Sequence, residues 1–163
     1  MTVHEVKPSV PDTLLSGADF ADAYAAAVYD HTLDARRAAE RMLAHNPRWV
    51  KFLLNLRNMI VAPFALKTSG AGDRTKLGMI GIFPVLSETS ARLVAGFDDR
   101  HLDFRVVVDV APSAEGREVI ATTLVKTHNL FGRIYLATIL PFHRLIVRNM
   151  LQRVVASPPE IIN

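Results

Sequence analysis

The segment from Asp98 to Val110 constrains the fold of this 163-residue chain more than any other. After a charged start, apolar and polar side chains alternate with a period of two, which is typical of a strand with one buried face. The apolar members are Leu102, Phe104, Val106, Val108 and Val110. The opposite face carries His101, Asp103, Arg105 and Asp109, with Val107 as its one apolar residue. We therefore expect a half-buried strand that also holds the densest titratable cluster of the chain.

Three further segments predict strands on either side of this one. They are residues 77–86, 91–97 and 117–128. Short polar turns at 87–89, 98–99 and 111–116 join consecutive strands, so the four are expected to form an antiparallel meander. Asn129 is then a suitable N-cap for a long amphipathic helix that ends near Val155.

The N-terminal half is read as two short helices after an irregular lead-in. Residues 33–44 predict a helix capped by Thr32, and residues 47–62 predict a second helix that begins at Pro47. Residues 20–29 are ambiguous, because their alanine content favours helix while their alternation also fits a strand. Residues 1–17 are expected to be irregular apart from a short edge strand at 3–6, and residues 156–163 to form a flexible tail.

Composition excludes several kinds of function. The chain has no cysteine, which rules out disulfides and thiolate chemistry. Its formal charge of +3 is spread along the chain, so no nucleic-acid partner is expected. Asp98 and Asp99 fit a turn better than a metal site, and we expect neither metal nor cofactor. The apolar run 134–142 is shorter than the roughly 20 residues that cross a bilayer. We therefore expect a cytoplasmic protein without integral membrane association.

Several short segments together resemble a known family. They are residues 47–50 (PRWV), 56–58 (LRN), 81–85 (GIFPV), 97–105 and 141–144 (PFHR). Their combination, over residues 18–155, resembles the bacterial family called domain of unknown function 2867. The element order is also similar to the helix-grip fold of the START and polyketide-cyclase-like superfamily.

This resemblance implies an α+β fold in one domain over residues 18–155. A curved antiparallel sheet of about five to six strands would wrap around the long C-terminal helix, with two short helices near the N-terminus. A helix-grip chain begins with a strand, so residues 20–29 are expected to be strand against their local propensity. An apolar cavity is expected between the sheet and the last helix.

The cavity implies a small-molecule function without an assigned chemistry. An apolar or amphipathic molecule is the expected partner, with Tyr135 and His143 as polar handles in an apolar lining. The expected ligand-binding residues are Trp49, Phe52, Phe83, Phe104, Tyr135, Phe142 and His143. The alternative for the last helix is plain core packing.

Two other functions stay open. The first is a cyclase, dehydratase or hydrolase-like enzyme, with His143 or His101 as acid/base and Tyr135 or Arg105 polarising a carbonyl. The alternative for His101, Asp103 and Arg105 is a solvated outer face.

The second is a homodimer or a partner-docking protein that uses an outer apolar patch of Val107, Ile120 and Leu124. A separate expectation is that Asp99 lies opposite His128 and ties the sheet to the last helix.

Overall fold

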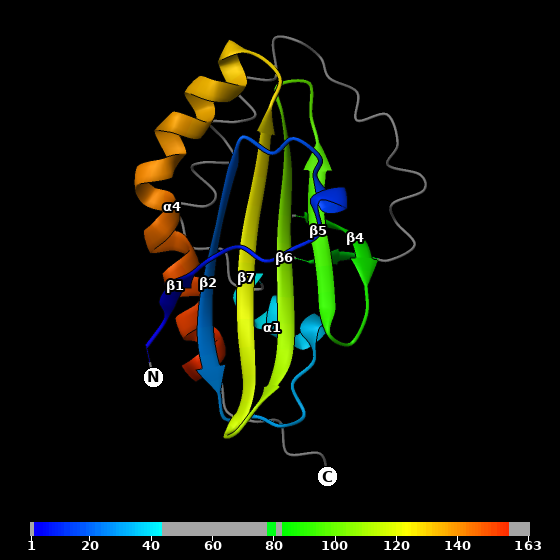
Figure 1. Cartoon of the computed structure of the whole chain (residues 1–163), viewed down its shortest axis with the longest axis vertical. Helices are drawn as coiled ribbons and strands as arrows, with labels where there is room; N and C mark the ends of the chain where they lie inside the picture. The colour runs from blue at the N-terminus through cyan, green and yellow to red at the C-terminus, as the bar shows by residue number, and fades with distance from the viewer. Residues whose placement is uncertain (1, 44–77, 81–82, 157–163) are drawn as a thin grey trace.

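The computed structural model describes residues 2–43, 78–80 and 83–156. These residues form an α+β fold in which an antiparallel sheet packs against a long C-terminal helix (Figure 1). The elements are β1 (His4–Val6), a 3₁₀ turn (Asp12–Leu14), β2 (Phe20–Val28), α1 (Ala35–Leu43), β3 (Met79–Ile80), β4 (Phe83–Glu88), β5 (Arg92–Asp98), β6 (Leu102–Ser113), β7 (Gly116–Thr127) and α4 (Leu130–Ala156).

The strand order is β1-β2-β7-β6-β5-β4-β3, and every neighbouring pair is antiparallel. Six strands form the main sheet, and the two-residue β3 pairs only with β4. The prediction that residues 20–29 form a strand is confirmed, because β2 pairs with β7 along its whole length. Tertiary pairing therefore overrides the helix propensity of its five alanines.

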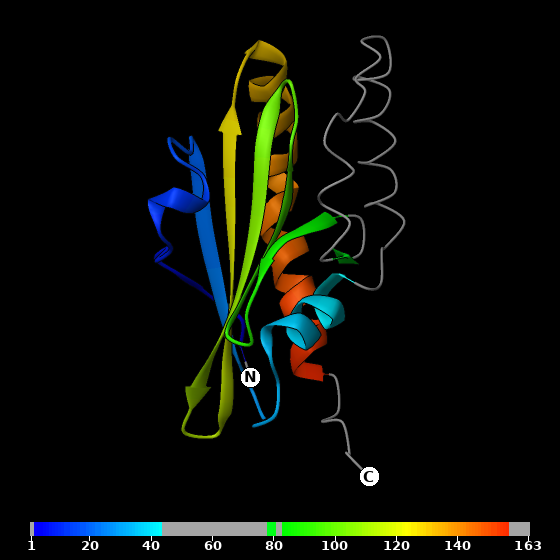
Figure 2. The same ribbon diagram turned by 90° about the vertical axis from the view of Figure 1, so that its right-hand side faces the viewer.

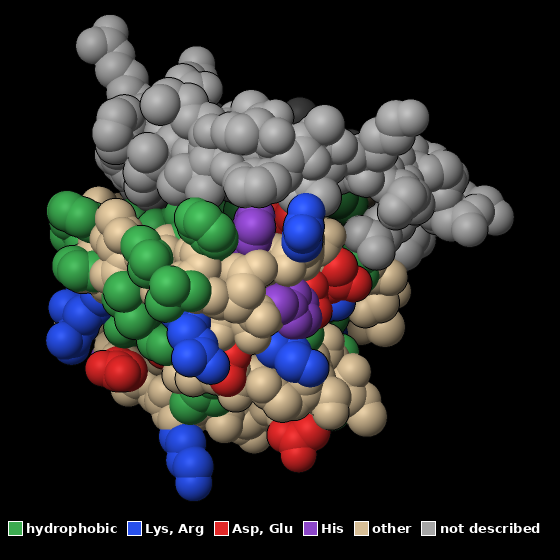
Figure 3. Space-filling view, turned by 90° about the horizontal axis from the view of Figure 1, so that it is seen from above, with side chains coloured by type: hydrophobic (Ala, Val, Ile, Leu, Met, Phe, Trp, Pro, Cys, Tyr) green, Lys and Arg blue, Asp and Glu red, His purple; other side chains and the backbone are tan. Residues whose placement is uncertain are grey.

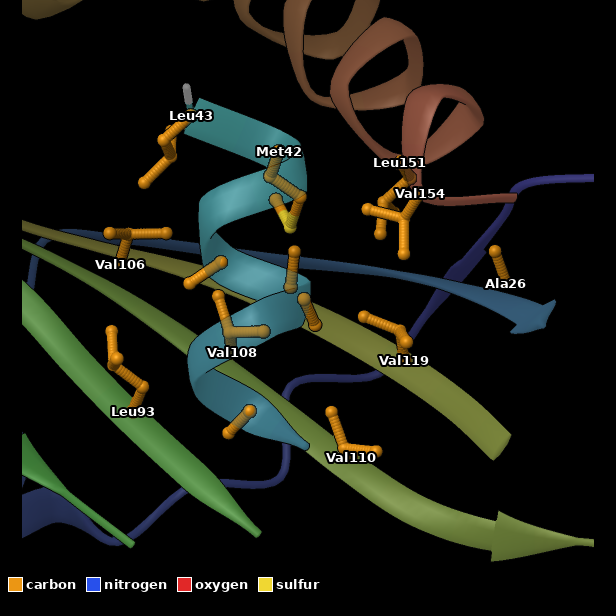
Figure 4. Close-up of a cluster of buried hydrophobic side chains, with 14 of the residues drawn as sticks. Ala26, Met42, Leu43, Leu93, Val106, Val108, Val110, Val119, Leu151 and Val154 are labelled. Carbon is orange, nitrogen blue, oxygen red and sulfur yellow. The ribbon is translucent and has the colours of Figure 1, made fainter. Parts of the chain in front are cut away.

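The two faces of the sheet are covered by different parts of the chain (Figure 2). Helices α1 and α4 lie on one side, here called the helix-side face. The N-terminal segment lies on the other, here called the outer face. The larger core cluster fills the helix-side face, where Val106, Val108 and Val110 of β6 meet α1 and α4. Figure 4 shows Met42 of α1 and Leu151 and Val154 of α4 converging over these strands.

A second, smaller core lies on the outer face. Val107 and Leu124 are buried there with Val94 and Leu15. Leu14 and Val10 of the lead-in pack against this cluster. Val107 and Leu124 are therefore not exposed as expected, since Val10, Leu14 and Leu15 pack over them, whereas Ile120, the third residue of the expected patch, is half-buried. The edge strand expected at 3–6 is present as β1, and the lead-in that follows it packs on the outer core through Val10, Leu14 and Leu15.

Two boundaries in the meander differ from expectation. The turn expected at 111–116 shortens to two residues, because β6 continues to Ser113 and β7 begins at Gly116. The single strand expected over 77–86 is split into β3 and β4, which pair with each other as Ile80↔Phe83. The register irregularity between β4 and β5 lies between Val85 and Ser87.

The helix caps show how side-chain geometry sets element boundaries. Asp34, and not Thr32, caps α1, because its Oδ1 accepts a hydrogen bond from the Arg37 backbone N–H at 2.8 Å. The prediction that Asn129 caps the last helix is confirmed by the 3.0 Å bond that its Oδ1 accepts from Gly132 N–H. The helix expected at 47–62 lies outside the described residues, so the described part has one α-helix before the meander, not two.

Helix α4 is long and apolar enough, by length and composition alone, to cross a membrane. This differs from the expectation that no segment of the chain reaches that length. One such helix is weak evidence for a span, because helices that pack on a soluble core can pass the same test. Val147, Leu151 and Val154 of α4 are buried in the core described above. Cytoplasmic location and the absence of a spanning segment both remain predictions.

Asp30 joins the end of β2 to helix α1. Its Oδ1 accepts hydrogen bonds from the backbone N–H and the hydroxyl of Thr32, at 3.0 and 2.7 Å. Its Oδ2 pairs with Arg41 at 3.3 Å, and the two side chains are only 3% and 13% exposed. Burial raises the pKa of Asp30, but the bonds from Thr32 and Arg41 together outweigh burial and hold that pKa below its ordinary value of 3.8.

We expect Asp30→Ala to lower the free energy of unfolding by about 3 kcal/mol at pH 7, because it leaves the Arg41 guanidinium buried without its carboxylate. Urea unfolding followed by circular dichroism measures this difference. Glu40→Ala is the matched control, since it removes a carboxylate from the exposed Arg36–Glu40 pair and should cost less than about 1 kcal/mol.

The loss of unfolding free energy caused by Asp30→Ala should depend on pH. A carboxyl group whose pKa is lower in the folded state stabilises the protein above its unfolded pKa and loses that effect as pH falls through the folded pKa. The difference between the native protein and Asp30→Ala should therefore be constant near neutrality and shrink below pH 3.8. A difference that stays unchanged at acid pH would contradict this account.

Candidate functional site

Four phenylalanines form a row across one end of the helix-side face. Phe20 on β2 and Phe104 on β6 both pair with Val125 on β7, and Phe97 on β5 pairs with Phe104. Phe83 on β4 extends the row, with its ring centroid 5.2 Å from that of Phe104 and 6.2 Å from that of Phe97. We call Phe20, Phe83, Phe97 and Phe104 the phenylalanine row.

The rings of this row are only half-buried. Further along β6 the side chains of Val106, Val108 and Val110 are buried under the helices. The row therefore forms an apolar floor whose aromatic surface remains partly accessible. Sequence reasoning placed Phe83 and Phe104 in the site, and the structure brings them together. It missed Phe20 and Phe97, because only the cross-strand register shows that they share this row.

A polar pair lies beside the row. Asp22 is two residues beyond Phe20 on β2, so both side chains project from the helix-side face. Its Oδ1 is 3.1 Å from Nε2 of His143 on α4, and the two side chains are 12% and 13% exposed. The ring of His143 meets that of Phe20 edge-on, with centroids 5.7 Å apart. His143 thus connects α4 to both the polar and the aromatic part of the site.

Other polar side chains lie next to Asp22 on β2 and β7. Thr123 on β7 pairs with Asp22 and is buried. On its other side, Thr123 pairs with Val106 of β6. Tyr24, the next residue of β2 on this face, is buried as well. Burial raises the pKa of Tyr24, and the charges of Asp22 and Glu5 add to this, so its phenol is neutral at pH 7. Polar groups therefore gather at the β2–β7 side, next to Phe20, and the other three rings of the row lie at the β4–β6 side.

The beginning of α4 is fixed by close backbone packing, which sets where His143 falls. Gly132 lies against the carbonyl of His101, and a Cβ atom at position 132 would come within 2.1 Å of that oxygen. The backbone N–H of His128 also donates to the same carbonyl at 2.9 Å. A helix anchored at this end carries His143 to β2 three turns later.

His101 does not lie on the polar face of β6 as expected. It precedes the strand and is buried at the start of α4, with its ring 5.6 Å from that of Phe131. Asn129 Oδ1 already accepts from Gly132, so its Nδ2 is the group that donates to His101 Nδ1, at 2.9 Å. His101 is thus remote from the Asp22–His143 pair, and its contacts are those of a helix anchor.

The other titratable side chains of this strand also separate from one another. Asp103 pairs with His128 at 3.0 Å, and Arg105 pairs with Asp98 at 2.7 Å. The expected pairing of Asp99 with His128 is wrong, because the register places His128 opposite His101.

Arg105 braces the phenylalanine row from the outer face. Its guanidinium donates to the carbonyls of Phe104 and Phe97 at 2.9 and 3.2 Å. Gly96, opposite Arg105, has φ +153° and lies so close to the Phe104 carbonyl that a Cβ atom would be 2.0 Å from it. Arg105 therefore positions backbone and does not reach the helix-side face, where a ligand would be bound.

The remaining expected site residues are distributed as follows. Tyr135 is half-buried on α4, whereas Phe142 is 58% exposed and does not join the row. Trp49 and Phe52 lie outside the described residues. Among the described residues, no group of three or more His, Asp or Glu side chains is placed to hold a metal ion.

The site can hold a polar atom and move a proton. A carboxylate bonded to one imidazole nitrogen fixes the orientation of the ring, which leaves the other nitrogen for proton exchange. In His143 the nitrogen bonded to Asp22 is Nε2, so Nδ1 is the nitrogen that would exchange a proton with a ligand.

A double-mutant cycle tests whether Asp22 and His143 interact as the distances indicate. We expect Asp22→Asn and His143→Gln, alone and combined, to give a coupling energy between about 0.5 and 3 kcal/mol in urea unfolding. The exposed Arg144–Glu5 pair, at 3.6 Å, is the matched control, and its cycle should give less than about 1 kcal/mol. Equal, negligible coupling in both cycles would show that the buried pair does not form.

The comparisons with known proteins identify a family for this chain. No curated protein and no solved structure matched the chain significantly. A family model described as "Protein of unknown function (DUF2867)" matches residues 14–150, which include the phenylalanine row, Asp22 and His143. The chain therefore belongs to the DUF2867 family.

Proposed function

We propose that this protein binds a small apolar or amphipathic molecule between the phenylalanine row and helix α4. The observation that carries the proposal is the row of four half-buried rings that ends at the buried Asp22–His143 pair. An apolar surface with few, well-placed polar groups is the usual make-up of a small-molecule site. Rings from β4, β5, β6 and β2 would contact the apolar part of the ligand, and His143 a polar atom.

The arrangement also favours the helix-grip fold that the sequence resembles. In that fold a sheet wraps around its last helix and leaves a cavity between the two. Here α4 runs along β2 and β7, and the row extends away from it toward β4. Tyr135, half-buried on α4, is in our proposal a second polar handle for the ligand.

Acid–base catalysis by His143 is the second candidate function. It is favoured by the 3.1 Å contact with Asp22, which orients the imidazole next to an apolar floor. Hydrolysis of a series of p-nitrophenyl esters by the native protein and by His143→Gln tests it. Catalysis that survives the substitution unchanged would remove His143 from the mechanism.

Native mass spectrometry of the freshly purified protein is the first test of binding. We expect a reproducible mass adduct that organic extraction releases as an apolar or amphipathic compound. Titration with the fluorescent probe anilinonaphthalene sulfonate gives an independent readout, which should be saturable and displaced by the extracted compound.

Substitutions in the row then locate the ligand. Phe104→Ala should weaken probe binding about tenfold, since covering the accessible part of a phenylalanine ring with ligand contributes about 1.5 kcal/mol. Phe142→Ala makes the same change at an exposed position and should leave binding unaltered. Phe104→Leu keeps most of the volume and controls for loss of folding. An apo mass together with equal probe binding by all variants would refute the proposal.

A further inference from the structure

Helix α4 exposes an apolar stripe on the side that faces away from the sheet. Its members are Leu130 (68% exposed), Phe131 (52%), Ile134 (55%), Phe142 (58%) and Leu145 (61%). Their spacing places them along one side of the helix, since residues three, four or eleven apart return to nearly the same face. Val147, Leu151 and Val154 lie on the opposite side and are buried. The helix therefore has two apolar faces, and among the described residues the core is built on the face of Val147, Leu151 and Val154, while the stripe is more than half exposed.

The stripe has basic and no acidic neighbours on its own helix. Residues 130–156 contain no aspartate or glutamate and four arginines, at positions 133, 144, 148 and 153. Arg133 and Arg144 are exposed. Figure 3, which looks down on the end where α4 begins, shows hydrophobic side chains gathered on one side, with basic and also acidic side chains at their edge. Glu5 of β1 lies 3.6 Å from Arg144, in a pair that is more than half exposed at both side chains.

An exposed apolar helix face bordered by arginines matches an anionic lipid surface. Apolar side chains enter the boundary between headgroups and acyl chains, while the guanidinium groups at its edge meet lipid phosphates. Large exposed apolar patches mark contacts with proteins or with membranes, and the arginines at the edge of this one favour the membrane. The remaining face of α4 is held by the core, so the helix would lie along the membrane and not cross it.

A second copy of the chain fits the stripe less well. Two stripes packed antiparallel about their centres would place Arg133 of one copy beside Arg144 of the other. Like charges at such a contact disfavour association. The same charges favour a surface of negatively charged headgroups.

We propose that α4 is a membrane-surface helix that docks this domain onto anionic lipid through the stripe and its flanking arginines. This goes beyond the proposed ligand site, which lies on the other side of α4, and it does not depend on it. The phenylalanine row and the stripe share no residue.

Flotation of the full chain with vesicles tests the proposal. Vesicles of phosphatidylcholine with 30% phosphatidylglycerol should carry the protein, and vesicles of phosphatidylcholine alone should carry at least tenfold less. Raising the salt concentration should weaken binding, because it screens the arginines. Ile134→Asn combined with Leu145→Asn should lower binding at least tenfold.

Matched controls separate the stripe from general charge and hydrophobicity. Tyr29→Asn removes an equally exposed ring elsewhere and should leave flotation unchanged. Arg133→Glu and Lys7→Glu change the net charge equally, but only Arg133→Glu should reduce binding several-fold. Circular dichroism shows whether each variant keeps its fold, and probe binding shows whether it keeps the ligand site. A failure of the ligand proposal can therefore be distinguished from a failure of the membrane proposal.

Three results would overturn the proposal. The first is no flotation of the native protein with anionic vesicles. The second is equal flotation of the Ile134/Leu145 variant. The third is a dimer by light scattering that the Ile134/Leu145 variant abolishes, without vesicle binding by the native protein, which would assign the stripe to self-association.

Discussion

The pairing of β6 with β7 is the interaction on which the rest of this structure depends. The two strands pair without a break from Leu102↔Thr127 to Ser113↔Gly116. Alternation then sends Val106 and Val108 to the helix-side core and Val107 to the outer core, so both faces of the strand are buried by different parts of the chain. A slip of one residue would exchange these faces, which is why such a register is strongly specified.

That register also assembles the candidate site. It pairs Phe104 with Val125, and the registers of β5 with β6 and of β2 with β7 then add Phe97 and Phe20 to the row and place Thr123 next to Asp22. Arg105 and Gly96 hold the backbone of this row from the outer face. The site is thus built on paired strands and not on loops, which favours a rigid floor over an adaptable one.

Helix α4 connects this floor to the surface of the molecule. It is anchored at its start by Asn129 and by the contact of Gly132 with the His101 carbonyl, and at its middle by His143 and Asp22. Placing an imidazole and a carboxylate in a mostly apolar space costs desolvation, and their mutual hydrogen bond offsets that cost. One side of the same helix faces the proposed ligand site, and the other carries the apolar stripe.

Local sequence signals determined the parts of the fold that depend on neighbouring residues. Alternation predicted β5, β6 and β7, and Asn129 was recognised as the cap of α4, because a strand face and a helix cap are set within a few residues. The strand at residues 20–29 was predicted only through resemblance to a known fold, since its alanines favour helix when considered alone.

Contacts between distant residues were decided by the tertiary structure. His128 pairs with Asp103, Arg105 with Asp98 and His143 with Asp22, because strand register and helix direction bring them together across the chain. The burial of Val107 beneath residues 10–15 and the exposure of Phe142 depend on the same long-range packing. Alternation along one strand shows which residues share a face, but only the elements packed on that face decide which are buried, paired or left at the surface.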